Sequence, residues 1–190
     1  MMRLVQFNSV LIALYFISLN TFAAEPPFPG APNGAAAFSP MIGDHSCTMT
    51  YRGEDGELTV KSDCRWHWYY KFEGHMVQDD FYMLDDAGKV IWTGSTLRTW
   101  EPSADRWNNM FLGSHGTGFG RMFHGKPVED EVHLEVDDED PDGTPHKNRI
   151  YFYEVEAGKF RWRQERSDEN GENWKVWVTV DINGPMAQTE

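Results

Sequence analysis

The feature that most constrains the fold is a succession of short segments in which apolar and polar side chains alternate, from about residue 44 almost to the end of the chain. Alternation is the period of a β-strand with one buried face, and no later segment has a convincing helical period. Turn dipeptides such as Asp55-Gly56 and Ala87-Gly88 separate the segments. The predicted strands are 44–53, 57–72, 76–84, 89–100, 106–114, 117–124, 128–137, 148–156, 159–167 and 172–183.

Sequential strands joined by short connections predict an all-β fold built as one antiparallel up-and-down meander. A sheet of about ten strands normally curls until its two edges pair, because open edges expose unpaired backbone groups. We therefore expect a single closed barrel. The later turns are expected at Lys126-Pro127, in an acidic loop over 138–146 and at Ala157-Gly158.

The two cysteines, Cys47 and Cys64, are predicted to form a disulfide across the first hairpin. If Asp55 and Gly56 form a two-residue type I′ turn, counting outwards places Cys47 directly opposite Cys64. The pair is then a non-hydrogen-bonded one with Cα atoms about 4.5 Å apart, near the short end of the range that a disulfide tolerates. The alternative is a pair of free, buried thiols.

The first 23 residues have the layout of a signal peptide. Arg3 precedes a short apolar run, and small residues flank Phe22 before the expected cleavage near Ala23. An uncleaved anchor is the alternative, although the run is short for a membrane span. Export predicts a periplasmic or secreted protein, in a compartment that favours disulfides. The rest of the chain divides into a Pro-, Ala- and Gly-rich leader over 24–40, a barrel domain over 41–184 and a tail over 185–190.

The composition narrows the choice of partners. The formal net charge is −13, and such a surface repels nucleic acid and anionic lipid. Neither nucleic acid nor membrane insertion after signal cleavage is therefore expected. Aromatic residues make up 14% of the chain, including eight Trp, which is too much apolar area for a disordered acidic protein. A compact domain with an aromatic interior or pocket is favoured.

The alternation also predicts which side chains point into the barrel, provided that no strand slips by one residue. In the second strand these are Leu58, Val60, Cys64, Trp66, Trp68, Tyr70 and Phe72. In the next two strands they are Val77, Asp79, Phe81 and Met83, then Val90, Trp92, Gly94, Thr96 and Arg98. Near the end of the chain, with a bulge assumed at Gly171, they are Tyr151, Tyr153, Val155, Phe160, Trp162, Gln164, Trp174, Val176, Val178 and Val180.

Several short motifs give the chain a family resemblance. They are Met41-Ile42-Gly43-Asp44-His45, Trp66-x-Trp68, Gly74-x-x-Val77-Gln78-Asp79, Gly94-Ser95-Thr96-Leu97-Arg98 and Ser167-Asp168-x-x-Gly171-x-x-Trp174. Together they resemble a lipocalin-like (calycin) family of bacterial proteins of unknown function, over about residues 41–180. The resemblance implies a barrel with a ligand cavity and supplies no activity. His45 stands where lipocalins carry the Trp of a Gly-x-Trp signature, so the packing role of that Trp does not carry over.

Few polar side chains share the predicted aromatic interior. Asp79 is expected opposite Thr96 and diagonal to Arg98, which predicts a buried Asp79–Arg98 ion pair, because buried charges need partners. The pair serves either as a polar anchor for a ligand or as a purely structural tie between strands. Two further polar residues on this face are His45, expected opposite Trp66, and Gln164.

Trp66, Trp68, Trp92 and Trp162 are expected either to line a cavity or to fill the barrel as a solid core. A barrel of this strand number is wide enough to hold one small ligand. Aromatic rings would favour an apolar or aromatic molecule.

The sequence predicts no metal or cofactor. No two histidines show ligand spacing, and no histidine follows His146, which argues against zinc and haem. The segment 138–143 matches the opening of a calcium loop, but Arg149 occupies the twelfth position, where a bidentate Glu is required. An acidic solvated turn is favoured there. The glycine-rich stretch 113–125 lacks the Lys-Ser/Thr of a phosphate loop and is interpreted as a hairpin near the barrel mouth.

Three functions are consistent with these observations. The leading hypothesis is an exported barrel that binds a small, largely apolar molecule against the four Trp side chains, oriented by Asp79 and Arg98. The second is an enzyme of isomerase or hydratase type with Asp79 or His45 as proton carrier. The third is a filled barrel that serves as an interaction module.

Overall fold

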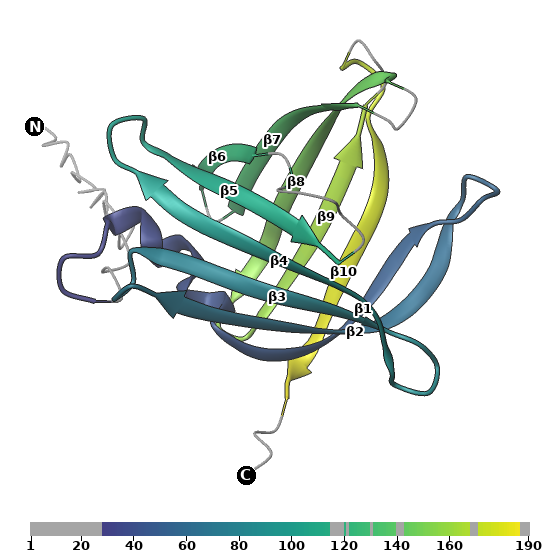
Figure 1. The fold of residues 1–190 in the computed structure, drawn as a ribbon, viewed down its shortest axis with the longest axis horizontal. Coiled ribbons are helices and arrows are strands. Elements are labelled where there is room, and N and C mark those ends of the chain that lie inside the picture. The colour runs from purple at the N-terminus through teal and green to yellow at the C-terminus, as the bar shows by residue number, and fades with distance from the viewer. Residues whose placement is uncertain are drawn as a thin grey trace, which may run out of the picture.

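The computed structural model describes residues 28–114, 120, 122–129, 131–139, 143–167 and 171–186. The predicted signal peptide therefore lies outside the described residues. The elements are a 3-10 helix, η1 (Asn33–Met41), and the strands β1 (Gly43–Arg52), β2 (Leu58–Lys71), β3 (Met76–Leu84), β4 (Val90–Glu101), β5 (Arg106–Gly113), β6 (Met122–Val128), β7 (Glu131–Glu139), β8 (Pro145–Glu156), β9 (Lys159–Arg166) and β10 (Lys175–Pro185) (Figure 1).

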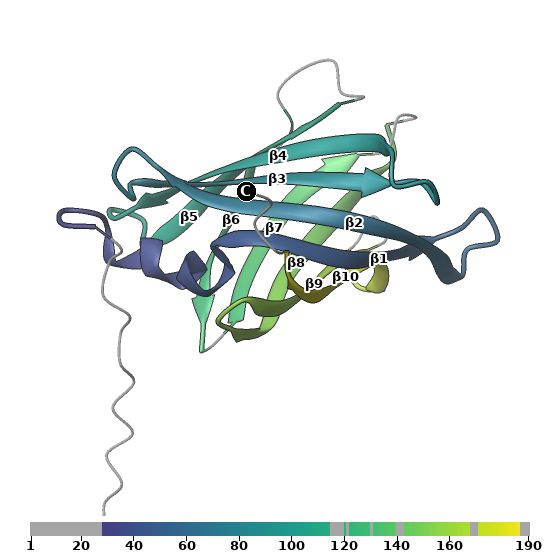
Figure 2. The ribbon, with the colours of Figure 1, turned by 90° about the horizontal axis from the view of Figure 1, so that it is seen from below.

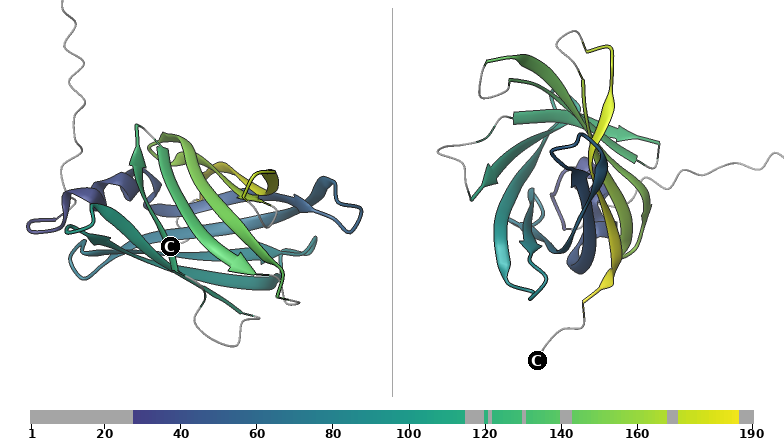
Figure 3. Two further views of the ribbon diagram at one scale, coloured as in Figure 1. Left: turned by 90° about the horizontal axis from the view of Figure 1, so that it is seen from above. Right: turned by 90° about the vertical axis from the view of Figure 1, so that its right-hand side faces the viewer.

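The strands form a closed antiparallel barrel in which each strand pairs with its neighbours in sequence. Closure comes from β1, which pairs with β2 on one side and with β10 on the other, so that Met49 lies opposite both Ser62 and Val180. The right-hand view of Figure 3 shows the strands arranged in a ring. The predicted all-β meander barrel is thus confirmed. No helix among the described residues is long and apolar enough to cross a membrane.

In the first hairpin the two cysteines pair as predicted, but the turn that joins the strands is not the predicted one. Gly53 pairs with Glu57 around a three-residue loop, and of the loop residues only Gly56 has a positive φ, of 78°. A type I′ turn needs a positive φ at two central residues, so this loop is not one. A register shift between Tyr51 and Arg52 compensates, and Tyr51 faces Val60 as expected. Further along, Cys47 lies opposite Cys64, is disulfide-bonded to it, and the two Cα atoms are 4.9 Å apart.

The predicted leader differs from the structure over residues 33–40, because η1 packs into one end of the barrel (Figure 2). Phe38 is fully buried, with its ring centroid 4.9 Å from that of Trp107 and 5.6 Å from that of Trp68. A Cβ atom on Gly34 would lie 2.2 Å from the Trp100 ring, so only glycine fits there. The Ser39 and Tyr70 hydroxyls, 2.6 Å apart, tie η1 to β2. The helix closes this end of the barrel.

The predicted inner face is correct for β3, where Val77, Asp79 and Phe81 are buried, and it fails on β8. Tyr151 and Tyr153 were expected inside, but both stack against Arg163 on the outer face. A register shift between Tyr153 and Glu156, with Glu154 at φ 51°, adds one residue to the strand. One added residue moves every preceding side chain of the strand from the inner face to the outer face, or the reverse. The inward side chains of β8 are therefore His146, Asn148, Ile150 and Phe152.

Other departures have similar causes. The bulge assumed at Gly171 lies instead between Val176 and Val178. Trp174 consequently lies outside, where the Arg149 guanidinium stacks over its ring at 3.7 Å. The expected turn at Lys126-Pro127 is part of β6, which runs on to Val128 and pairs with β7. The predicted inward residues Phe72 and Val90 are exposed, because Phe72 lies in the turn that follows β2 and Val90 is the first residue of β4.

Candidate functional site

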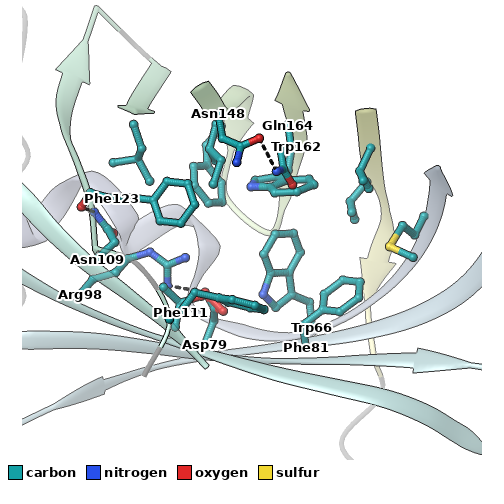
Figure 4. A pocket seen from close by; sticks show the side chains of 18 of the residues that line it. Trp66, Asp79, Phe81, Arg98, Asn109, Phe111, Phe123, Asn148, Trp162 and Gln164 are labelled. Atoms are coloured by element: carbon teal, nitrogen blue, oxygen red, sulfur yellow. Dashed lines mark hydrogen bonds and ion pairs between the residues drawn. The ribbon is translucent and has the colours of Figure 1, made fainter. Parts of the chain in front are cut away.

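The barrel is hollow on the side of the core away from η1. A cavity of about 540 Å³ lies between the sheet formed by β2–β5 and the strands β8–β10 that face it (Figure 4). Most of its wall is apolar, and the rings that line it are Trp66, Phe81, Trp92, Phe111, Phe123, Phe152 and Trp162. Its size is that of a pocket for a small organic molecule.

Seven of the nine predicted binding residues line this cavity: Trp66, Asp79, Trp92, Thr96, Arg98, Trp162 and Gln164. The other two, Trp68 and His45, are buried but do not line it. Trp68 lies in the core behind the residues that line the cavity, and its ring is stacked on that of Phe38. His45 Nε2 is 2.8 Å from the Met41 carbonyl oxygen, and its ring packs edge-on against Phe160. His45 therefore connects η1 to the core.

The predicted ion pair between Asp79 and Arg98 is present. The Arg98 Nη1 group donates a hydrogen bond to Asp79 Oδ1, and the side chains of Arg98 and Asp79 are only 4% and 2% exposed, respectively. Burial raises the pKa of the Asp79 carboxyl above its ordinary value, an effect that the charge of Arg98 opposes. The same burial lowers the pKa of the Arg98 guanidinium, and the charge of Asp79 opposes that shift. Each group thus depends on the other to stay charged inside the barrel.

Aromatic rings fix the plane of Arg98. Its Cζ atom lies 4.5 Å from the centroid of Trp68, 5.2 Å from that of Phe38 and 5.7 Å from that of Phe152. Cation–π contacts of this kind strengthen when water is excluded. The guanidinium is held between the ion pair and these rings, so it presents a fixed edge to the cavity.

Asn109, which the sequence analysis did not single out, is a further polar residue of the wall. It lies directly opposite Arg98 in the β4–β5 pairing and is 1% exposed. Its amide nitrogen donates to the Phe123 carbonyl oxygen at 3.3 Å, whereas its Oδ1 atom has no partner. The Arg98 Nε–H is also buried without a partner. Continuing the strand register from Arg98 across the turn at 102–105 would have found Asn109.

A second polar group lies on the opposite wall. Gln164 Nε2 donates to Asn148 Oδ1 at 3.0 Å, as Figure 4 shows. Asn148 Nδ2 donates in turn to Asp138 Oδ2 at 3.1 Å and lies 3.3 Å from His146 Nε2. Of these residues only Gln164 was predicted from the sequence, because the bulge at Glu154 concealed which side chains of β8 point inward.

Among the described residues, no group of three or more His, Cys, Asp or Glu side chains is placed to hold a metal ion. Of the predicted acidic turn at 138–143, Asp138 and Glu139 form the end of β7, and 140–142 lie outside the described residues. The glycine-rich stretch is likewise described only in part.

Comparisons with known proteins support the fold. The chain resembles the crystal structure of Rv2717c from M. tuberculosis, with a TM-score of 0.58 at 9% identity, over 82% of this chain and 99% of that one. At this identity the likeness shows a shared barrel fold and nothing about activity. No protein-family model matches the chain, and no curated protein is significantly similar to it in sequence. The lipocalin-like resemblance therefore stays a prediction.

Proposed function

We propose that this protein binds a small, largely apolar or aromatic molecule inside its barrel. The observation that carries the proposal is the cavity of about 540 Å³, whose wall combines aromatic rings with the ion pair of Asp79 and Arg98. Burying a ligand against such rings removes apolar surface from water, and a few fixed polar groups set its orientation. The hypothesis of a filled barrel that serves as an interaction module does not account for this cavity.

The enzymatic alternative has less support. The enzyme hypothesis assigns proton transfer to His45 or Asp79. His45 is packed between η1 and Phe160, away from the cavity. Asp79, the other, is engaged by Arg98. Binding is therefore the function that the geometry favours.

The fluorescent probe N-phenyl-1-naphthylamine, which is neutral and apolar, tests the proposal. Ile150 lines the cavity, whereas its neighbour Tyr151 lies on the outer face of the same strand. We expect Ile150→Trp to fill the cavity and weaken binding by about tenfold or more, equivalent to ~1.4 kcal/mol. Tyr151→Trp is the matched control and should leave the affinity unchanged. Equal effects of the two variants, or no binding to the unmodified protein, would count against the proposal.

We further propose that the chain is exported to the periplasm or beyond. The Cys47–Cys64 disulfide and the signal-like first 23 residues support this, since disulfides persist in oxidising compartments. Expression of the full chain in a Gram-negative bacterium, followed by intact-mass measurement of the periplasmic fraction, should give a product that begins near Ala24. A full-length product retained in the cytoplasm would contradict export.

A further inference from the structure

The wall of the cavity formed by β8–β10 carries polar atoms that a ligand can reach. Gln164 and Trp162 both line the cavity. Gln164 Oε1 and Trp162 Nε1 have no hydrogen-bond partner among the described residues, yet neither atom is sealed from solvent. On the facing wall, Arg98 Nε, Asn109 Oδ1 and Trp66 Nε1 also have no partner, but these three atoms are fully buried and out of a ligand's reach. Gln164 and Trp162 are therefore candidates for direct polar contacts.

Strand β9 places these two side chains next to each other on the inner face. Gln164 pairs with Ile150 of β8 and Val178 of β10, both of which line the cavity. Trp162 is two residues earlier on the same strand, and residues two apart in a strand point to the same side. Figure 4 shows the Gln164 amide beside the indole ring of Trp162.

A chain of hydrogen bonds fixes the orientation of the Gln164 amide. An ionised carboxylate only accepts, so Asn148 turns its Nδ2 group to Asp138 Oδ2, at 3.1 Å. The same Nδ2 group lies 3.3 Å from His146 Nε2. The Asn148 Oδ1 atom is thereby left to accept from Gln164 Nε2, at 3.0 Å. Because Gln164 uses its nitrogen for this bond, its Oε1 atom remains as an acceptor for a ligand.

The acceptor of Gln164 and the N–H donor of Trp162 together suit a hydroxyl group, which donates and accepts through a single oxygen. From this geometry we propose that the ligand is an apolar or aromatic molecule with a hydroxyl group, whose O–H donates to Gln164 Oε1 and whose oxygen accepts from Trp162 Nε1. The inference rests on the proposed binding function and names its ligand class. The apolar body of the ligand then lies against the rings of Trp92 and Phe111 on the facing wall.

Three ligands with one aromatic body test the hydroxyl: 2-naphthol, 2-methoxynaphthalene and 2-methylnaphthalene. All three are neutral at pH 7, and their affinities follow from displacement of N-phenyl-1-naphthylamine from the full chain. We expect 2-naphthol to bind at least about tenfold more tightly than 2-methoxynaphthalene, which accepts a hydrogen bond but cannot donate one.

The outcomes separate this inference from the proposed function. Equal affinities of the three compounds, or a bound probe that none of them displaces, would overturn the hydroxyl inference and leave the cavity a binding site. Failure of the probe itself to bind would defeat the proposed function.

Gln164→Met locates the acceptor, because it keeps the length of the side chain and removes the amide. This variant should abolish the preference for 2-naphthol over 2-methoxynaphthalene and retain the affinity for 2-methylnaphthalene. Thr96→Val removes a hydroxyl from the facing wall and is the matched control, in which the preference should persist. A preference that survives in a folded Gln164→Met variant would contradict the assignment. If that variant does not fold, the ligand series on the unmodified protein still decides.

Trp162→Phe locates the donor, because it removes the N–H and keeps an aromatic ring. Both 2-naphthol and 2-methoxynaphthalene carry the accepting oxygen. Their affinities relative to that of 2-methylnaphthalene should therefore fall by the same factor. A loss confined to 2-naphthol, or no relative loss for either compound, would overturn the role given to Trp162.

Discussion

Arg98 lies between Trp68 and Asp79, stacked over the indole ring of the first at 4.5 Å and hydrogen-bonded to the carboxylate of the second. The three residues stand on adjacent strands, and Trp68 is directly opposite Asp79. The ion pair is thereby fixed at the boundary between the solid core around η1 and the cavity. The ion pair contacts both the core and the cavity, so it supports the fold and shapes the candidate site.

The contributions of Asp79 and Arg98 to the free energy of unfolding should be strongly coupled. Removing one partner leaves a buried charge unpaired, which typically costs about 3–5 kcal/mol. We expect Asp79→Leu and Arg98→Leu each to lower the free energy of unfolding by about this amount. The double variant should be no less stable than either single one, because it leaves no unpaired charge. Urea denaturation of the four proteins measures the coupling, and purely additive losses would contradict the account.

The 3-10 helix should be part of the folded domain. Phe38 is fully buried among Trp68, Trp107 and Phe152. Phe38→Ala should therefore cost about 3–5 kcal/mol, the usual range for a buried aromatic side chain. Phe28, which is 40% exposed, gives the matched control, and Phe28→Ala should cost far less. Equal melting temperatures for Phe38→Ala and the unmodified protein would show that η1 does not pack as described.

The disulfide should add stability without being needed for the barrel. It links residues 17 apart in sequence, and closing a loop of that size contributes about 3 kcal/mol in the chain-entropy model. We expect the Cys47→Ala/Cys64→Ala double variant to unfold at lower urea concentration with an unchanged far-UV spectrum. Thiol labelling of the denatured unmodified protein should detect no free cysteine. Two reactive thiols per chain would contradict the pairing.

Alkaline titration should show that the phenol of Tyr69 has a raised pKa. Burial, the hydrogen bond to Asp80 and the charge of Asp80 raise the pKa of Tyr69 to about 12. The unfolded chain releases this proton near its ordinary pKa of about 10. The contribution to stability is therefore complete below pH 10 and is lost as the pH rises from there towards 12. Phenolate absorbance at 295 nm should show a component near pH 12 whose amplitude falls by one tyrosine in Tyr69→Phe. An unchanged amplitude at that pH in the variant would contradict the assignment.

The sequence was most informative where strands stay in phase. Alternation alone predicted the inward facing of Trp66, Asp79 and Arg98, because no bulge interrupts the pairing of β2, β3 and β4 between these residues. The cysteine pairing was right although the turn was not, since a bulge near Arg52 compensated for the longer loop. A local error that is cancelled nearby leaves the register beyond it intact.

The remainder could not be predicted for equally physical reasons. The bulge at Glu154 has no glycine or proline to mark it, so the inward facing of Asn148 and Phe152 was hidden. The helix η1 lies in a stretch rich in Ala, Gly and Pro, whose composition resembles a linker. Its role depends on Phe38 filling the end of a barrel, a long-range contact that no local pattern encodes.

The indole N–H signals of the eight Trp residues offer the most direct test of the central claim that the barrel binds a molecule in its cavity. Trp66, Trp92 and Trp162 line the cavity, whereas the other five do not. Titrating 2-naphthol into ¹⁵N-labelled protein should shift these three signals and leave those of Trp174 and Trp177, on the outer surface, in place. Shifts confined to Trp174 and Trp177, or no shifts at saturating ligand, would contradict binding in the cavity.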